Sequence, residues 1–323
     1  MGGWIVGILV GLVVLDLLIH AVFAVMVIPI FERKIPFAVE GHPPVPDVER
    51  ISFPSTNSVT LRGCLYRHET RPPRGLVIFC PELEGNHWSA LSYCQGLWDA
   101  GFDILAFDFR NQGESDHLAG YEPLHWLTEF EVADVLAAIR YAKDRPDVRD
   151  LSLGLMGISR GGGAALAAAS RSRDVRCIAC EGAFSTAGLL LHFTLRWASL
   201  YIPSWVLKPV PFWHIRITLA ITQWLSQKRR GCRYTNLERW LPGLKDRPVL
   251  MIAGSRDTYV HPEISSMLCN RIGHDHATLW MVEGAKHNVA RQVDSEAYDN
   301  RLVDFFSRLP VPSTSEKLRQ PAV

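Results

Sequence analysis

The sequence lacks an excess of charge of either sign. Its 323 residues include 34 lysines and arginines against 33 aspartates and glutamates. Binding to nucleic acid usually rests on a strong basic excess, so we expect no nucleic acid partner. Charged residues make up only 21% of the chain and hydrophobic residues 48%. This composition excludes an intrinsically disordered protein and suffices for a large buried core.

The sequence also lacks a cysteine framework. Its seven cysteines are scattered, and Cys177 and Cys180 form the single C-x-x-C pair. A zinc finger needs a second pair or nearby histidines, and a disulfide scaffold needs an even set in a short chain. We therefore expect buried free thiols in a reducing compartment, and neither a bound metal nor a cofactor.

A long apolar run is present at the N-terminus. Only two polar residues interrupt it between Trp4 and Ile30, whereas about 20 apolar residues suffice to cross a bilayer. Residues 1–31 are therefore predicted to form a transmembrane anchor. A cleaved signal peptide is the alternative, with Val22 and Ala24 before the cleavage site, but the basic segment that begins such peptides is missing.

Charged and small residues refine this prediction. Arg33 and Lys34 follow the apolar run, so the positive-inside rule places the rest of the chain in the cytoplasm. Asp16 and His20 lie one helical turn apart and are expected to pair with each other inside the membrane. Three small residues spaced four apart would also let two copies of the helix pack closely in a homodimer. These residues are Gly3, Gly7 and Gly11.

Beyond the anchor the chain divides into a linker, a large domain and a tail. The proline-rich residues 32–47 are interpreted as a linker that separates anchor from domain, and residues 311–323 as a disordered tail. Within 48–310, short apolar runs alternate with segments of helical periodicity, which predicts an α/β domain with a mostly parallel sheet and helices on both faces. The expected strands are 48–53, 59–66, 76–80, 104–107, 151–156, 177–180, 249–253 and 278–282. The expected helices are 91–100, 125–143, 161–170, 263–271 and 295–309.

The interval 185–247 is too long for an ordinary connection and must contain structure of its own. It is rich in tryptophan and basic residues, and prolines divide it into at least two helical pieces. We expect a helical cap that either only packs on the domain beneath or also touches the membrane surface. Because it is inserted at the carboxyl edge of the sheet, its tryptophans, such as Trp205 and Trp213, are expected to line the substrate cleft.

A glycine-rich turn follows the expected strand 151–156. The residues from Gly157 to Gly161 read GISRG, a G-x-S-x-G motif between a strand and a helix. In this motif the serine occupies a strained turn, and the glycines let strand and helix approach each other. A phosphate-binding loop would end in Gly-Lys-Ser or Gly-Lys-Thr, which is absent here.

The serine of this motif, Ser159, needs a base and an orienting carboxylate, because a serine hydroxyl is a poor nucleophile at neutral pH. Asp257 comes shortly after the expected strand 249–253, and His287 shortly after the strand 278–282. The carboxyl ends of parallel strands meet at one edge of a sheet, so the three side chains are expected to lie together there.

These features resemble the α/β-hydrolase superfamily, and the resemblance extends from Val48 to Leu309. The segment from Asp108 to Ser115, DFRNQGES, is similar to the D-x-R-G-x-G-x-S turn of that family, with Asn111 in place of one glycine. The resemblance implies the α/β-hydrolase fold with a helical cap. It also implies serine-hydrolase chemistry.

By this resemblance Ser159 is the nucleophile, His287 the general base and Asp257 the orienting acid. Side chains that compete with them by residue type are His261, His274, His276, Asp246 and Asp275. Their positions relative to the strands fit these roles less well, because most of them precede a strand rather than follow one.

The loop after the strand 76–80 departs from the family pattern. Where the family usually has H-G-x-x-G, the residues from Pro81 to Asn86 read PELEGN. Matching the end of this loop makes the backbone N–H of Leu83 one donor of the oxyanion hole, with Glu82 as the alternative. The N–H of Arg160 is the second donor. The Arg160 side chain is expected to pair with a glutamate of this loop, with an anionic part of the substrate as the alternative partner.

The sequence therefore predicts a membrane-anchored serine hydrolase that cleaves an ester or thioester. The anchor and the apolar cap favour an acyl or lipid-like substrate. Two alternatives stay open. One is a serine peptidase of the prolyl-oligopeptidase type, a group that often carries an N-terminal propeller not evident here. The other is a non-catalytic, membrane-tethered binding protein on the hydrolase scaffold.

Overall fold

An eight-stranded sheet forms the centre of the molecule, in the order β1-β2-β4-β3-β5-β6-β7-β8. The computed structural model describes residues 2–35, 41–68 and 72–310, so the predicted disordered tail lies outside the described residues. The strands β1 and β2 run antiparallel at one edge, and the six strands from β4 to β8 pair in parallel. The strands are β1 (Glu49–Pro54), β2 (Thr60–Tyr66), β3 (Leu76–Cys80), β4 (Asp103–Phe107), β5 (Leu153–Ile158), β6 (Val175–Glu181), β7 (Val249–Gly254) and β8 (Ala277–Val282).

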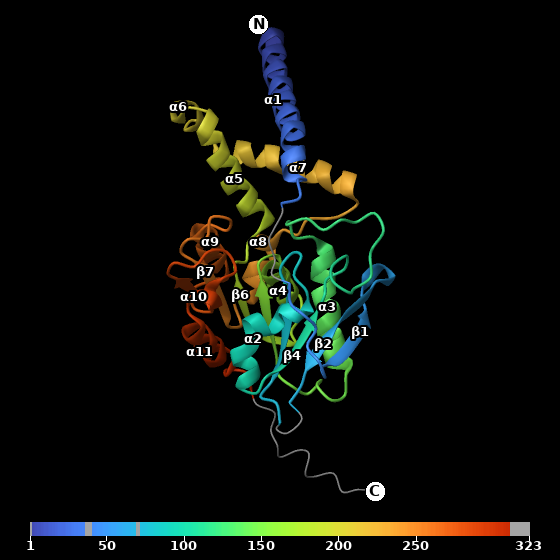
Figure 1. Cartoon of the computed structure of the whole chain (residues 1–323). Coiled ribbons are helices and arrows are strands. Elements are labelled where there is room, and N and C mark those ends of the chain that lie inside the picture. The colour runs from blue at the N-terminus through green and yellow to red at the C-terminus, as the bar shows by residue number, and fades with distance from the viewer. Residues whose placement is uncertain (1, 36–40, 69–71, 311–323) are drawn as a thin grey trace.

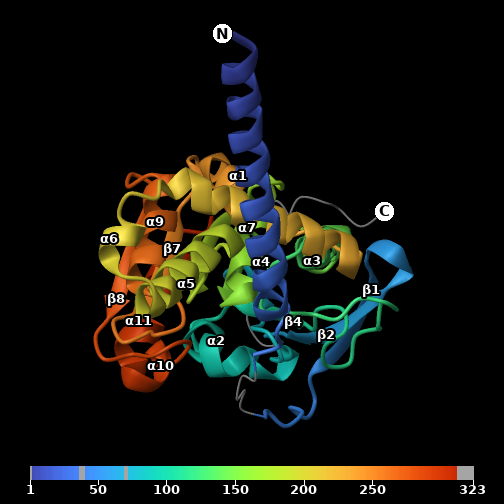
Figure 2. The ribbon, with the colours of Figure 1, turned by 90° about the horizontal axis from the view of Figure 1, so that it is seen from above.

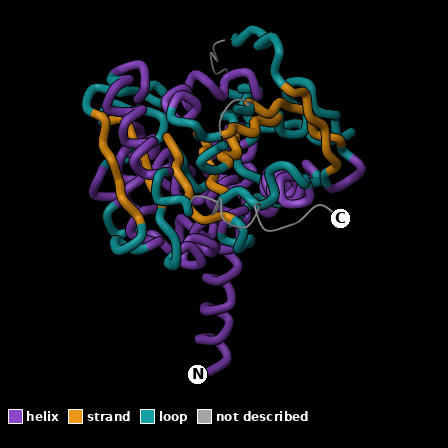
Figure 3. Tube along the Cα trace, turned by 90° about the horizontal axis from the view of Figure 1, so that it is seen from below, coloured by secondary structure: helices purple, strands orange, loops and turns teal. Residues whose placement is uncertain are grey.

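Helices cover both faces of this sheet, as predicted (Figure 1). Every side chain of β3, β4, β5 and β7 is buried, because these strands lie between two apolar layers. One layer is formed by α3 (Glu129–Asp144), α4 (Arg160–Ala169) and α9 (Pro262–Ile272), and the other by α2 (Ala90–Asp99) and α11 (Ser295–Phe306). Short helical turns are η1 (Thr56–Ser58), η2 (His87–Ser89), η3 (Leu241–Leu244) and α10 (Ala290–Val293). Figure 3 shows the strands crossing the body from one side to the other, with helices on either side of them.

Helix α3 begins four residues later than its periodicity predicts. Thr128 caps it, because its hydroxyl accepts from the N–H of Phe130 at 3.2 Å and the Glu131 carboxylate accepts from the N–H of Thr128 at 2.9 Å. This reciprocal arrangement is a capping box, which fixes the first turn of a helix. His125 consequently lies in the loop before the helix.

The interval 185–247 is helical, as predicted. It contains α5 (Thr186–Tyr201), α6 (Ser204–Leu207), α7 (Phe212–Arg230) and α8 (Leu237–Trp240). Pro203 and Pro211 directly precede α6 and α7, where a proline fixes the backbone before the first helical turn. Helices α5 and α6 project from the body toward the same end as the N-terminal helix, and α7 crosses that helix near its base (Figures 1 and 2).

The N-terminal helix α1 (Gly2–Phe31) has 30 residues and is therefore about 45 Å long. From Gly3 to Phe31 it is long and apolar enough to cross a membrane. Most of its apolar side chains are exposed, whereas the face that carries His20, Ala24, Ile28 and Phe31 is buried. This face packs against α7.

The end of α1 belongs to the core of the body. The Phe31 ring stacks on Trp126 with 4.8 Å between ring centroids, and the Trp126 indole N–H donates to the Phe31 carbonyl oxygen at 2.7 Å. The expectation that residues 32–47 separate an independent anchor from the domain is therefore corrected. The physical reason is that α7 and Trp126 offer an apolar surface that the last turns of α1 cover.

The cysteines and the small residues of α1 complete the fold. All seven cysteines are buried and free, as predicted, and burial raises the pKa of the Cys177 thiol to about 12. At Gly3, Gly7 and Gly11, a Cβ would meet no described atom within 4 Å apart from the neighbouring residues and the nearby backbone of the same helix. The helix dimer stays a prediction.

Candidate active site

Ser159 lies in the turn between β5 and α4. Its φ of 52° is in the left-handed region, which a residue with a side chain adopts only at some cost. Close packing around this turn requires glycine. A Cβ on Gly161 would lie 2.3 Å from the carbonyl oxygens of Cys80 and Pro81, and one on Gly157 would lie 2.7 Å from the Gly161 oxygen. The G-x-S-x-G spacing thus follows from the contact of strand and helix that exposes the serine hydroxyl to the cleft.

The structure brings the three predicted side chains together at the carboxyl edge of the sheet. His287 Nε2 lies 2.9 Å from Ser159 Oγ, and His287 Nδ1 lies 2.7 Å from Asp257 Oδ2. The other oxygen of Asp257 accepts from the backbone N–H groups of Tyr259 and Val260, each at 2.8 Å. The carboxylate is therefore fixed, and it orients the imidazole with a lone pair toward the serine hydroxyl.

The competing side chains lie elsewhere. Those concerned are His261, His274, His276, Asp246 and Asp275, and none of them lines the cavity that contains Ser159. His261 precedes α9, with its Nδ1 3.8 Å from Glu263 Oε2. Asp246 pairs with Arg247 at 3.0 Å, and the remaining three are exposed in the turn before β8.

A cavity of about 450 Å³ opens beside Ser159. Its walls come from the loops that follow the strands and from the segment between α10 and β8. Lining residues include His42, Glu82, Leu83, Tyr93, His125, Arg160, Phe184, Tyr259, His287, Val289 and Arg291. Among the described residues, none of 185–247 lines it, so the prediction that cap tryptophans form its walls is wrong. Trp205, in α6, and Trp213, in α7, are 76% and 60% exposed and lie outside the lining of the cavity.

Two backbone N–H groups are available for an oxyanion. Leu83 and Arg160 both line the cavity, and neither N–H donates to another group in the part of the chain that the structure describes. Arg160 is the first residue of α4, where helical N–H groups have no intrahelical acceptor and the helix dipole favours negative charge. These two donors are the predicted ones, and their catalytic role stays a prediction.

The unusual glutamates of the oxyanion loop point to different partners. Glu84 Oε1 lies 3.3 Å from Lys34 Nζ, so this carboxylate is paired with a lysine. Glu82 is buried and its carboxyl accepts from the Tyr93 hydroxyl at 3.3 Å. Burial raises the pKa of the Glu82 carboxyl above the usual value of a glutamate.

The Arg160 side chain pairs with Glu131 rather than with a glutamate of the oxyanion loop. Its Nη1 donates to the Leu124 carbonyl oxygen at 2.8 Å and lies 3.5 Å from Glu131 Oε1. Glu131 also accepts from the Tyr121 hydroxyl at 2.6 Å. The expected structural pairing exists, but its partner is a helix residue that the capping box holds in place. This corrects the predicted partner.

His125 is a cavity residue that sequence reasoning missed. Burial, with a smaller contribution from the Arg160 charge, lowers the pKa of its imidazole to about 3, so this histidine is neutral near pH 7. A neutral imidazole in the cleft can donate or accept a hydrogen bond without changing the charge there. No signal in the sequence marks it, because it follows no strand and its periodicity merges with that of α3.

Glu181, at the end of β6, is a second residue that sequence reasoning missed. Its carboxylate accepts from the N–H of Ala290 and from the Tyr298 hydroxyl, each at 2.9 Å. It thereby fixes the loop that carries His287. Burial raises the pKa of Glu181 to about 7. Its position at the same strand edge as Ser159 was a usable signal, since a carboxylate that ends a buried strand needs a partner nearby.

Comparison with known proteins agrees with this geometry. A sequence model described as "Alpha/beta hydrolase family" matches residues 77–298, and the chain therefore belongs to that family. It is 29% identical over 117 residues to an uncharacterised 31.7 kDa protein of Escherichia coli, which covers 36% of this chain and 40% of that protein. It is 28% identical over 134 residues to the thiohydrolase aneE of Aspergillus aculeatus, which covers 40% of this chain and 39% of that protein. The chain thus matches about two fifths of the length of these curated relatives.

The fold is shared with solved hydrolases. The structure of the Pyrococcus furiosus esterase Pf2001 superimposes with a TM-score of 0.61 at 21% sequence identity. The match covers 85% of this chain and 97% of that chain. At this level of identity the likeness defines the α/β-hydrolase fold, and it leaves the substrate to be inferred from the site.

Proposed function

We propose that this protein is a membrane-anchored serine hydrolase that cleaves a carboxylic ester or thioester through an acyl-enzyme. The observation that carries the proposal is the continuous hydrogen-bond chain from Ser159 through His287 to Asp257, with distances of 2.9 Å and 2.7 Å. Such a chain makes a serine hydroxyl nucleophilic, and the family to which the protein belongs supports the same chemistry.

In the proposed reaction Ser159 Oγ attacks the acyl carbon while His287 Nε2 takes the hydroxyl proton. The backbone N–H groups of Leu83 and Arg160 stabilise the oxyanion of the tetrahedral intermediate. The C–O or C–S bond then breaks, and the imidazolium gives its proton to the leaving alcohol or thiol. Water repeats the sequence on the acyl-enzyme, with His287 as base, and releases the carboxylic acid. Asp257 stabilises the imidazolium in both halves.

The membrane part of the proposal rests on α1 and the cap helices. Several large apolar side chains of the cap are exposed at the end of the molecule from which α1 projects. We call them the exposed cap aromatics; they are Trp197, Tyr201, Trp205, Phe212, Trp213 and Trp224. Exposed basic residues accompany them, namely Arg196, Lys208, Arg216, Lys228 and Arg229. Aromatic and basic side chains together favour the headgroup region of a bilayer, which supports anchoring with the body on the cytoplasmic side.

The cleft supports an acyl substrate of modest size. Its volume is about 450 Å³, and apolar walls from Leu83, Phe184 and Val289 alternate with polar groups such as His125 and Arg291. Apolar walls bind acyl carbons by burial, while the polar groups suit a hydrated head on the leaving side. The similarity to a protein named as a thiohydrolase makes a thioester the first variant to compare with an ester.

The test is activity-based labelling of the full chain in detergent or nanodiscs. We expect a fluorophosphonate probe to label the wild type, and Ser159→Ala to remove the label. Acyl esters, acyl thioesters and peptide amides of matched acyl groups then rank the substrate classes by kcat/KM. Preference for amides would support the peptidase alternative. A folded wild type that neither labels nor turns over any of them would support the binding-protein alternative and overturn the proposal.

A further inference from the structure

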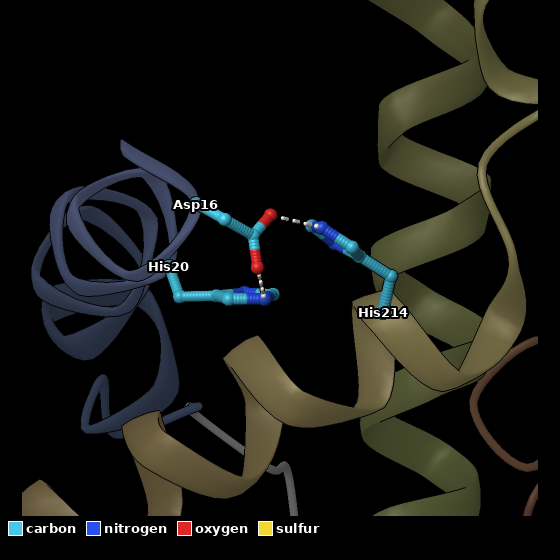
Figure 4. Close-up of side chains that lie close together, drawn as sticks. All are labelled: Asp16, His20 and His214. Atoms are coloured by element: carbon cyan, nitrogen blue, oxygen red, sulfur yellow. Dashed lines mark hydrogen bonds and ion pairs between the residues drawn. The ribbon is translucent and has the colours of Figure 1, made fainter. Parts of the chain in front are cut away.

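A second cluster of chemistry-bearing side chains lies where α1 meets α7, well apart in the fold from the serine. Asp16 and His20 come from α1 and His214 from α7, and Figure 4 shows both imidazole rings directed toward the Asp16 carboxylate. His214 Nε2 lies 2.8 Å from Asp16 Oδ1, and His20 Nε2 lies 3.5 Å from Asp16 Oδ2. One ligating atom from each residue lies within 4.8 Å of the others. The sequence predicted the Asp16–His20 pair but not its third member.

One ring nitrogen of His20 makes no hydrogen bond to the described residues, and an Asp16 carboxylate oxygen lies 3.5 Å from it. Its Nδ1 lies 2.7 Å from the Thr218 hydroxyl. Its Nε2 is buried and has no hydrogen-bond partner among the described residues, since 3.5 Å to Asp16 exceeds the usual N–H···O length. When Nδ1 donates to Thr218, Nε2 presents a lone pair toward a carboxylate, an arrangement that is repulsive unless a cation lies between them.

We propose that Asp16, His20 and His214 bind a divalent transition-metal ion of the Zn²⁺ class. Two imidazoles and one carboxylate are a ligand set that zinc accepts, with a fourth position open to water. Ligand atoms at about 2.05 Å in a tetrahedral site lie roughly 3.3 Å apart. The histidine nitrogens lie 2.8 Å from one oxygen of Asp16 and 3.5 Å from the other, and one ligating atom from each residue lies within 4.8 Å of the others, so the side chains must rotate inward to hold the ion.

The contacts around these three side chains fit this assignment. Thr218 fixes the His20 ring through its Nδ1, the kind of outer contact that orients a metal-binding histidine. The Asp16 and His214 side chains are 48% and 27% exposed, so protein atoms do not enclose the site. Nitrogen and oxygen ligands without thiolate favour zinc and neighbouring metals over copper(I) or iron–sulfur clusters. The expectation of no metal was drawn from the cysteines, which take no part here.

The bound ion would join the membrane helix to the cap. Asp16 and His214 are 198 residues apart, so the site exists only when α1 is docked on α7. The ion also offsets the cost of keeping a carboxylate on an apolar helix. Its role is structural, because the ligands belong to a contact between helices and none of them lines the cleft of Ser159. The inference is therefore independent of the proposed hydrolase function.

The test is metal binding by the purified full chain in detergent. After exposure to Zn²⁺ and removal of free metal, we expect one equivalent of zinc by elemental analysis. Replacement by Co²⁺ should give the intense visible absorption of four-coordinate cobalt. His214→Gln and Asp16→Asn should each weaken zinc binding at least about tenfold. His274→Gln, which changes an exposed histidine outside the cluster, should bind as the wild type does.

His20 is buried, so His20→Gln can disturb folding as well as metal binding. If His20→Gln misfolds, the result for His214→Gln, at a partly exposed position, decides the test. Fluorophosphonate labelling of Ser159 reports the fold of the body in each variant, and circular dichroism does so if the hydrolase proposal fails. A wild type that retains no stoichiometric zinc would overturn the proposal and leave a hydrogen-bonded triad. Unchanged zinc binding by folded His214→Gln would also overturn it, by placing the metal elsewhere.

Discussion

The sheet-edge site and the α1–α7 contact each place an aspartate beside histidine, yet they hold the carboxylate in different ways. Asp257 lies in a loop, where two backbone N–H groups donate to one of its oxygens and His287 occupies the other. Asp16 lies within a helix, whose N–H groups already bond to carbonyls one turn earlier. The Asp16 carboxylate therefore depends on other side chains or on a cation for its interactions within the protein. A loop after a strand can thus build a preorganised carboxylate from its own backbone, whereas a helix must recruit distant partners.

The two regions also differ in what surrounds them. The triad lies at the carboxyl edge of the sheet, and its groups are fixed by hydrogen bonds within the body. The α1–α7 contact has a buried side and a widely exposed apolar side. Chemistry is therefore expected to depend on the first region, and attachment and stability on the second. The following experiments test this division.

The largest effect is expected from His287→Ala. Removing the base that contacts Ser159 Oγ should lower kcat/KM for the best ester by about 10³-fold or more, because the serine loses its proton acceptor. His274→Ala is the matched control at an exposed histidine and should keep full activity. A loss of less than tenfold in His287→Ala would contradict the division, since another group would then serve as base.

Phe31→Ala tests whether the end of α1 belongs to the body. The ring is buried against Trp126, so its removal should lower the free energy of unfolding by about 3 kcal/mol or more through lost burial and a cavity. Thermal or denaturant unfolding in detergent measures this. Phe23→Ala, at an exposed position of the same helix, should change stability little. Equal stability of Phe31→Ala and wild type would restore the view of an independent anchor.

Glu181 predicts a pH dependence of stability. Burial raises its pKa to about 7 from the model-compound value of 4.5, so the folded state binds this proton more tightly than the unfolded state. Its contribution therefore favours the folded state most at low pH and is lost as the pH rises from about 4.5 through about 7, a change of about 3 kcal/mol. Glu181→Gln should flatten this part of the stability profile. An unchanged slope in the variant would assign the pH dependence to other groups.

The smallest effect is expected from the exposed cap aromatics. Trp205→Ala and Trp213→Ala should each weaken the preference of the full chain for anionic over neutral vesicles a few-fold. Neither should change the preference among acyl chain lengths, because neither residue lines the cleft. Trp240→Ala is the control, since this indole lies under Arg171 in the body. A shift in chain-length preference without a change in vesicle binding would reverse these assignments.

Much of the hydrolase fold was accessible from local patterns. The strand 76–80 was predicted with its observed ends, and the strands that precede Ser159, Asp257 and His287 were predicted to within two residues. The reason is that a fully buried parallel strand is a continuous apolar run, which the sequence displays directly. The start of α3 was missed because periodicity continued through His125, while the capping box at Thr128 set the observed boundary.

By itself the sequence determined the order of strands and helices, and with it the meeting of Ser159, Asp257 and His287, because parallel strands must share a carboxyl edge. It also determined that an apolar helix lies at the N-terminus, observed as Gly2–Phe31. Only the tertiary structure decided which groups cover each other: Glu131 on Arg160, α7 on α1, and His214 beside Asp16 across 198 residues. Periodicity reports which face of a segment is apolar, but the partner that covers this face is chosen by packing between segments far apart in the chain.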